Sequence, residues 1–224
     1  MNDTSVVMIS WSPDEYRLKV LRQCFASLKA HTKRDHTLVV VDNGVNGQKE
    51  FLEDQDIDIL IRPKVNLGVG MSRKVGVGAT DSKYVAVVDN DIGFFPGWLD
   101  ACIGALERYP DRKLVATAVK THPMKYARHK EGMLDEYELW RRCAGMCLVM
   151  RRSDYDILSK FNPTATNVGH RFCLNVRNKG YHFIWHPSWT GRHLSKTASF
   201  HYKKQWFNKE TGTWHNKESN HGQK

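Results

Sequence analysis

Two carboxylates, Asp89 and Asp91, follow an apolar run in the segment Val87-Val88-Asp89-Asn90-Asp91. Like charges this close together repel each other, so the pair is unsuited to a buried core. A divalent cation relieves the repulsion, and Mg²⁺ and Mn²⁺ prefer oxygen ligands, which they often share with substrate phosphates. The pair therefore indicates a metal site that faces a phosphorylated substrate. The alternative is a solvated turn rich in Asp and Asn.

A second acidic residue, Asp42, stands at the end of another apolar run, Leu38–Val41, and is followed by Asn43-Gly44. An Asp in this position could accept hydrogen bonds from a nucleotide base or a ribose. Asn-Gly after a strand is also a common turn, and that simpler interpretation stays open.

The segment Asn66–Lys74 combines small residues with two cations, Arg73 and Lys74. Free backbone N–H groups and nearby cations are typical of a helix start that faces a phosphate. The segment lacks the third glycine of the dinucleotide motif and the Gly-Lys-Ser/Thr ending of the P-loop. Its glycines could instead allow close packing of a helix.

Apolar strands and helices alternate in the first half of the chain and must position these loops. Strands are expected at 6–9, 38–41, 57–61, 84–88 and 114–119, and helices at 14–30 (with Ser12 as N-cap), 47–54, 69–80 and 96–109. This alternation predicts a mostly parallel sheet with helices on both faces. Ligands bind beyond the carboxyl ends of such strands, where Ser10 and the three polar loops fall.

The second half is less regular. A polar loop is expected over 120–140, with a helix near 131–140, followed by a strand at 144–150, helices at 153–160 and 168–179, and a strand at 183–185. We expect a domain over 1–191, with a nucleotide-sugar-binding half (1–119) and an acceptor-side half (120–191), and a basic aromatic C-terminal extension over 192–224.

In this order and spacing, the motifs resemble the nucleotide-sugar glycosyltransferases of the GT-A fold, and glycosyltransferase family two most of all. The resemblance covers roughly residues 5–193. The segments that carry it are Val6–Ser10, Val41–Gly44, Asn66–Gly68, Tyr84–Asp91, Pro96–Leu99, Ala144–Arg152, Gly180–Phe183 and Pro187. It implies a metal-dependent enzyme with a Rossmann-like GT-A domain, which moves a sugar from a nucleoside diphosphate sugar, most commonly a UDP-sugar, to an acceptor hydroxyl.

The resemblance also implies roles for individual residues. Asp42 would contact the base, and Asp89 the sugar and ribose. Asp91 would hold Mn²⁺ or Mg²⁺, with Asp89 beside it, and His193 would bind the metal or the pyrophosphate, unless it is a surface histidine. The residues assigned to the nucleotide sugar are Ser10, Asp42, Asn43, Asn66, Gly68, Arg73, Lys74 and Asp89.

One departure from the family pattern concerns the general base. Family members usually carry a Glu-Asp pair at the start of the helix that precedes the Gly-Tyr strand, whereas residues 167–171 here contain no carboxylate. An inverting transfer needs a base for the acceptor proton. The candidates are His170 and the carboxylates Asp135, Glu136 and Glu138. A retaining enzyme would need no such base, and we prefer a substituted base.

The formal net charge of +10 is concentrated in two segments. Arg112–Lys130 holds six Lys or Arg and no acid, and 192–224 holds seven against two acids, interleaved with aromatic residues. Cations mixed with rings are typical of nucleic-acid surfaces. We therefore favour a polyanionic acceptor, specifically DNA with hydroxymethylated bases, flipped out of the duplex. The alternatives are a cell-envelope glycan or lipid-linked sugar acceptor, and a non-catalytic binding protein on a GT-A scaffold.

Ordinary globular composition excludes a chain disordered throughout, and no apolar stretch is long enough for a membrane span or a secretory signal. The five cysteines show no Cys-x-x-Cys spacing, which favours a reduced compartment, and Cys143 and Cys147 are expected to be buried core thiols. These features predict a cytoplasmic protein, in a bacterial host if it is phage-encoded.

Overall fold

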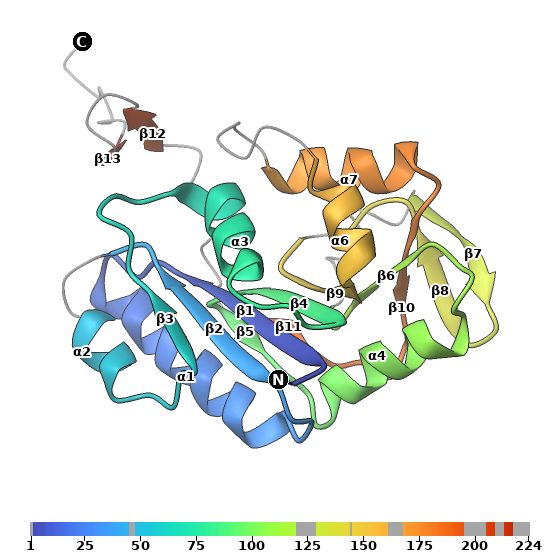
Figure 1. The fold of residues 1–224 in the computed structure, drawn as a ribbon, viewed down its shortest axis with the longest axis horizontal. Helices are drawn as coiled ribbons and strands as arrows, with labels where there is room; N and C mark the ends of the chain where they lie inside the picture. The colour runs from blue at the N-terminus through green and yellow to red at the C-terminus, as the bar shows by residue number, and fades with distance from the viewer. Residues whose placement is uncertain are drawn as a thin grey trace, which may run out of the picture.

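The computed structural model describes residues 2–44, 48–119, 129–143, 145–160, 168–194, 205–208 and 213–216. A nine-stranded sheet runs through the described part of the chain in the order β3-β2-β1-β4-β9-β6-β10-β8-β7 (Figure 1). Its strands are β1 (Thr4–Ser10), β2 (Thr37–Asp42), β3 (Ile59–Ile61), β4 (Tyr84–Asp89), β6 (Leu114–Thr117), β7 (Lys130–Leu134), β8 (Tyr137–Trp140), β9 (Cys147–Arg151) and β10 (His182–Trp185).

The four strands from β3 to β4 are parallel, as the apolar runs predicted. Strand β9 then enters antiparallel between β4 and β6. Strands β6 and β10 are parallel to each other, and β8 and β7 complete the far edge as an antiparallel hairpin. The sheet is therefore mixed, and the polar loops follow the carboxyl ends of its parallel strands.

Helices cover both faces of the sheet, and the buried residues form one cluster on each face. The cluster with α1 (Glu15–His31), α2 (Gln48–Glu53) and α4 (Trp98–Arg108) takes Val6 and Met8 from β1. The cluster with α3 (Gly68–Gly78), α6 (Arg152–Leu158) and α7 (Val168–Asn178) takes Val7 and Ile9. Successive strand residues point to opposite faces, so a fully apolar strand is buried on both sides. This confirms the predicted α/β class.

Two features differ from the sequence-based expectation. The predicted helix near 131–140 is wrong, because β7 and β8 pair antiparallel and Asp135, with a φ of 49°, makes the turn between them. Alternate exposure and cross-strand ion pairs such as Lys130–Glu138, 2.7 Å apart, suit a half-exposed hairpin. The predicted N-cap Ser12 is also wrong. Helix α1 is capped by the carboxylate of Asp14, which accepts from the backbone N–H of Arg17 at 2.8 Å.

Two short ladders were not predicted. Strand β5 (Ile92–Gly93) pairs antiparallel with β11 (Arg192–His193), and β12 (Gln205–Asn208) pairs with β13 (Thr213–Asn216). Much of the predicted basic surface lies outside the described residues: Lys120, Lys125, Arg128, Lys196, Phe200, Tyr202, Lys203, Lys204, Lys209, Lys217 and Lys224.

All five cysteines are buried and free, which confirms the burial predicted for Cys143 and Cys147. Among the residues that the structure describes, no helix has both the length and the apolar character to cross a bilayer.

Candidate active site

The carboxyl ends of β1, β2 and β4 lie side by side and carry the predicted site residues. In the strand registers, Ser10 is opposite Asp42, and Ile9 is opposite Asp89. The sheet therefore brings together loops that are far apart in the sequence, at the edge where parallel sheets bind ligands.

Asp42 is buried, and its carboxylate already has protein partners. One oxygen accepts from the N–H of Gly44 at 3.0 Å and from the Gln48 amide, and the other accepts from Arg62 Nε at 3.3 Å. The hydroxyl of Ser10 beside it is fully buried and has no hydrogen-bond partner in the described part of the chain. Asp42 thus orders the loop, and Ser10 offers the free polar atom of this pair.

Asn43 connects the β2 loop to the segment that begins α3. Its side-chain oxygen accepts from the N–H of Leu67 at 3.1 Å and from Ser72 Oγ at 3.0 Å. The Asn66 side chain accepts from the N–H of Gly68 at 2.8 Å, and Gly68 has a φ of 69°, which favours glycine. These bonds fix the start of α3. Asn43 therefore positions the loop before α3 through its own side chain.

Helix α3 lies so close to the sheet that Gly76 has no room for a side chain. A Cβ at this position would lie 2.4 Å from Val7 Cγ1. Arg73 stands three residues earlier, on the same helix face, and is only 6% exposed. Close packing therefore holds at Gly76, beyond the segment Asn66–Lys74, and it places Arg73 in the interior. A Cβ at Gly68 would meet no atom within 4 Å. Lys74, the next residue, is exposed.

Arg73 joins the two predicted halves of the domain. Its Nη2 donates to Asp89 Oδ1 at 3.0 Å and to the backbone oxygen of Gly145, and its Nε has no hydrogen-bond partner among the described residues. Desolvation raises the pKa of Asp89 to about 6, opposed by the Arg73 charge and assisted by the charge of Asp91. A buried cation here suits an anionic ligand as well as a carboxylate.

Asp91 and His193 meet although they come from distant parts of the sequence. His193 Nε2 lies 2.8 Å from Asp91 Oδ2, and the N–H of Leu194 donates to the backbone oxygen of Asp91 at 2.7 Å. The β5–β11 ladder sets this contact by pairing His193 with Ile92. Asn90, which stands between Asp89 and Asp91 in the sequence, donates to the Ser12 hydroxyl at 3.1 Å and ties the acidic loop to the segment after β1.

The Asp91–His193 pair is suited to a divalent cation. Adjacent ligands of an octahedral Mg²⁺ or Mn²⁺ are roughly 3 Å apart, close to the observed separation of the two side-chain atoms. Among the described residues, no group of three His, Cys, Asp or Glu side chains could hold a metal ion. The remaining ligands would have to be substrate oxygens and water, as is usual for these ions.

The predicted base candidates lie in two different places. His170 is exposed in the first turn of α7, and the neighbouring Gly169 Cα lies 3.9 Å from the Cβ position of Gly145, beside Arg73. The β7–β8 hairpin is four strands away from β4, roughly 19 Å across the sheet. The start of α7, with Gly169 next to His170, therefore lies near Arg73, whereas the hairpin carboxylates lie apart from the Arg73–Asp89 pair.

The hairpin carboxylates are occupied by surface partners. Arg108 pairs with Asp135 at 3.2 Å and with Glu136, and Lys130 pairs with Glu138. Three residues that hold Asp42 and Arg73 were not predicted from the sequence: Gln48, Arg62 and Gly145. A cation directly after the third predicted strand was the available signal for Arg62. Nothing in the local pattern identified the other two.

Comparison with known proteins identifies a family for most of the chain. The family model described as "Glycosyl transferase family 2" matches residues 5–193. No curated protein matches the chain significantly.

Two solved structures share the fold. GalNAc-T7, solved with UDP, GalNAc and Mn²⁺, superposes with a TM-score of 0.67 at 12% identity, over 87% of this chain and 44% of that one. TarS 1-349 of S. aureus gives a TM-score of 0.62 at 14% identity, over 87% of this chain and 60% of that one. At such identities the likeness concerns the fold, and the chain spans less than two thirds of either protein.

Proposed function

The chain belongs to glycosyl transferase family 2 and has the GT-A fold, and we propose that the edge formed by β1, β2 and β4 is its transfer site. It is a nucleotide-sugar glycosyltransferase. In the proposed reaction an acceptor oxygen attacks the anomeric carbon. The bond from that carbon to the diphosphate breaks, and the nucleoside diphosphate leaves with the bonding electrons.

The observation that carries the site assignment is the contact between Asp91 and His193 beside the Arg73–Asp89 pair. A preorganised cluster of opposite charges in a half-buried position is expected where charge develops in a reaction. Arg73 and the start of α3 would face the diphosphate, and the free hydroxyl of Ser10 would face the nucleoside. Asp42 would support the base-binding loop through its bonds to Gly44 and Arg62.

Asp91 and His193 would hold Mn²⁺ or Mg²⁺, with Asp89 near the donor sugar and ribose. The presence of UDP and Mn²⁺ in the GalNAc-T7 structure supports a UDP-sugar and this class of ion. When bound, the ion would neutralise charge on the leaving diphosphate. The protein residues would orient the donor and exclude water from the anomeric carbon.

His170 is our choice for the base that takes the acceptor proton. It is exposed to an incoming acceptor and follows Gly169, which lies beside Gly145 and Arg73. The hairpin carboxylates lack this placement. Inversion at the anomeric carbon is expected with such a base, and an NMR assignment of the product anomer would test it. Retention would remove His170 from this role.

For the acceptor, we propose a polyanion, with hydroxymethylated DNA as the specific candidate. Its support is the clustering of positive charge in 112–130 and 192–224, read from the sequence. The test is binding of duplex DNA at low salt, with a truncation before Arg192 as the comparison. Binding that weakens with salt and with truncation supports DNA, and no measurable binding excludes it.

The decisive experiment for the donor is a screen of nucleotide sugars by release of nucleoside diphosphate, with Mn²⁺, with Mg²⁺ and with EDTA. One donor should be turned over with a metal and not with EDTA. Transfer should then be followed by mass on hydroxymethylated and unmodified DNA, and on carbohydrate acceptors. Full turnover in EDTA would contradict the metal assignment while leaving the enzyme class intact.

A further inference from the structure

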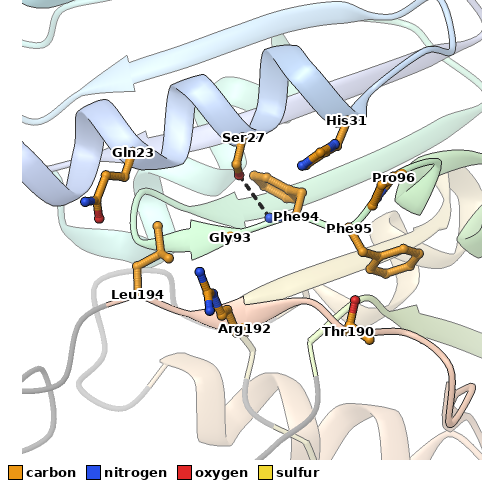
Figure 2. Close-up of a pocket in the computed structure, with 10 residues that line it drawn as sticks. All are labelled: Gln23, Ser27, His31, Gly93, Phe94, Phe95, Pro96, Thr190, Arg192 and Leu194. Atoms are coloured by element: carbon orange, nitrogen blue, oxygen red, sulfur yellow. Dashed lines mark hydrogen bonds between the residues drawn. The ribbon is translucent and has the colours of Figure 1, made fainter.

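A separate cavity lies on the side of β11 that faces helix α1. It is open to solvent on one side, has a volume of about 490 Å³ and is lined by α1, by residues 93–96 and by residues 190–194 (Figure 2). This volume is within the range of small-molecule sites, roughly 300–1,000 Å³. No residue assigned to the donor, the metal or the base lines it.

Helix α1 forms a polar wall of the cavity, and the opposite wall combines apolar groups with Arg192 and Thr190 (Figure 2). Gln23, Ser27 and His31 recur every four residues on α1 and form a polar stripe along the helix. Facing them are aromatic and aliphatic groups, among which Phe95 is half-buried and Leu194 extends from β11 (Figure 2). Such a site can hold a ring on one side and polar groups on the other.

The charge of the lining has a definite sign. None of the ten lining residues is acidic, whereas Arg192 is a permanent cation. Arg192 is exposed, and within the described part of the chain its guanidinium has no hydrogen bond or ion pair. The Ser27 hydroxyl is already committed, because it accepts from the N–H of Phe94 at 3.0 Å. Arg192 is therefore the group most available to a ligand, and its planar donors suit a carboxylate or a phosphate.

The position of Arg192 links this cavity to the metal pair. Arg192 and Leu194 face the cavity, and His193 between them contacts Asp91. Arg192 is paired with Gly93 and Leu194 is bonded to Asp91, so the short segment is held along its length. A ligand bound to Arg192 would contact the same strand that presents His193, from the opposite side.

We propose that this cavity is a second binding site, distinct from the donor site, for a small anion that carries a ring. The guanidinium of Arg192 binds the carboxylate or phosphate group, and the ring lies against Phe95 and Leu194. The site does not depend on the transfer reaction, so its test needs neither donor nor metal.

The test is calorimetric titration of the full chain with phenyl phosphate in EDTA. We expect one site with a Kd of about 1 mM, a modest affinity for a ligand of this size. Inorganic phosphate should bind at least about 5-fold more weakly, because it lacks the ring. Equal affinity for the two probes would overturn the assignment of a ring.

Variants locate the binding. Arg192→Gln should weaken the binding of phenyl phosphate at least about 10-fold. The affinity of Arg192→Lys should lie between those of Arg192→Gln and the wild type, because lysine keeps the charge without the planar fork of donors. Arg177→Gln, at an exposed position in the last turn of α7, is the matched control and should change Kd less than about 2-fold. Thermal melts would verify that each variant is folded.

Asp91→Asn separates the two sites. Binding that persists in this variant and is lost in Arg192→Gln supports the proposal. Binding that is lost in Asp91→Asn and kept in Arg192→Gln would place the probe in the donor site and overturn it. The absence of saturable binding to the wild type would overturn it as well.

Discussion

The edge of β1, β2 and β4 and the β7–β8 hairpin contain the same kinds of charged residues but hold them differently. At the edge, Asp42 and Arg73 are almost fully buried, and their bonds reach loops far away in the sequence. In the hairpin, Arg108 and Asp135 have side chains about half exposed. Buried pairs depend on every partner, whereas exposed pairs contribute little. The burial of charged residues therefore distinguishes a binding site from an ordinary solvated surface better than the residue types do.

The largest expected effect is on catalysis by Asp91→Ala. Loss of the carboxylate would remove several kcal/mol of charge stabilisation, so transfer should fall by roughly 10³-fold. The measurement is the rate of nucleoside diphosphate release at saturating metal. The control is Asp111→Ala, at an exposed position after α4, which should retain the wild-type rate. Equal activity of both variants would contradict the metal assignment.

His170→Ala tests whether the general base belongs to the site at the edge of β1, β2 and β4 or to the β7–β8 hairpin. The loss of a general base should lower kcat by roughly 10²-fold, with KM for the donor little changed. Glu138→Gln in the hairpin should stay within about 2-fold of the wild type, because Glu138 pairs with Lys130 away from the site. A reversed order of the two variants would return the base to the hairpin.

For stability, the contrast is between Asp42→Ala and Glu136→Gln. Removing the Asp42 carboxylate leaves the Gly44 N–H, the Gln48 amide and the Nε of Arg62 without this acceptor, at a cost of about 2–3 kcal/mol. Glu136→Gln should leave the urea midpoint unchanged within error. Urea unfolding measures both, and similar midpoints for the two variants would contradict the contrast.

The smallest effect concerns pH and the hairpin carboxylate Glu131. Burial alone would raise its pKa, but hydrogen bonds from Arg141 and His182 hold this pKa below its usual range. A lowered pKa stabilises the fold above the unfolded pKa, and this contribution is lost as the pH falls through the folded value. Between about pH 6 and pH 3, the Tm of the wild type should therefore fall more steeply than that of Glu131→Gln. Parallel curves would show that the bonds contribute nothing.

The sequence predicts the buried half of this molecule well. Continuous apolar runs specify β1, β2 and β4, and the polar residues after them fall at one edge because parallel strands share a direction. The α/β class follows from this alternation, whereas the GT-A fold was implied by the resemblance to glycosyltransferase family two. The hairpin was missed because half-exposed strands carry charged residues with no continuous apolar run, and a charged run over 130–140 also suits a helix.

The site was predictable in its residues and less so in its contacts. Asp89 and Asp91 stand out locally, but the contact of Asp91 with His193 depends on a ladder of two-residue strands, which leaves almost no pattern. The burial of Arg73 depends on the close approach at Gly76, a property of tertiary packing. The carboxylates of the hairpin were plausible from their type alone, and only the strand order showed their distance from β4.

The insertion of β9 between β4 and β6 has a consequence for the order of folding. During synthesis from the N-terminus, β4 and β6 emerge well before the strand that must lie between them. The centre of the sheet can close only after residue 151 has been made, so the segment 1–119 should not fold as an autonomous unit. A nascent chain released before that point would expose the edge of β4, and we expect such fragments to aggregate or to be degraded.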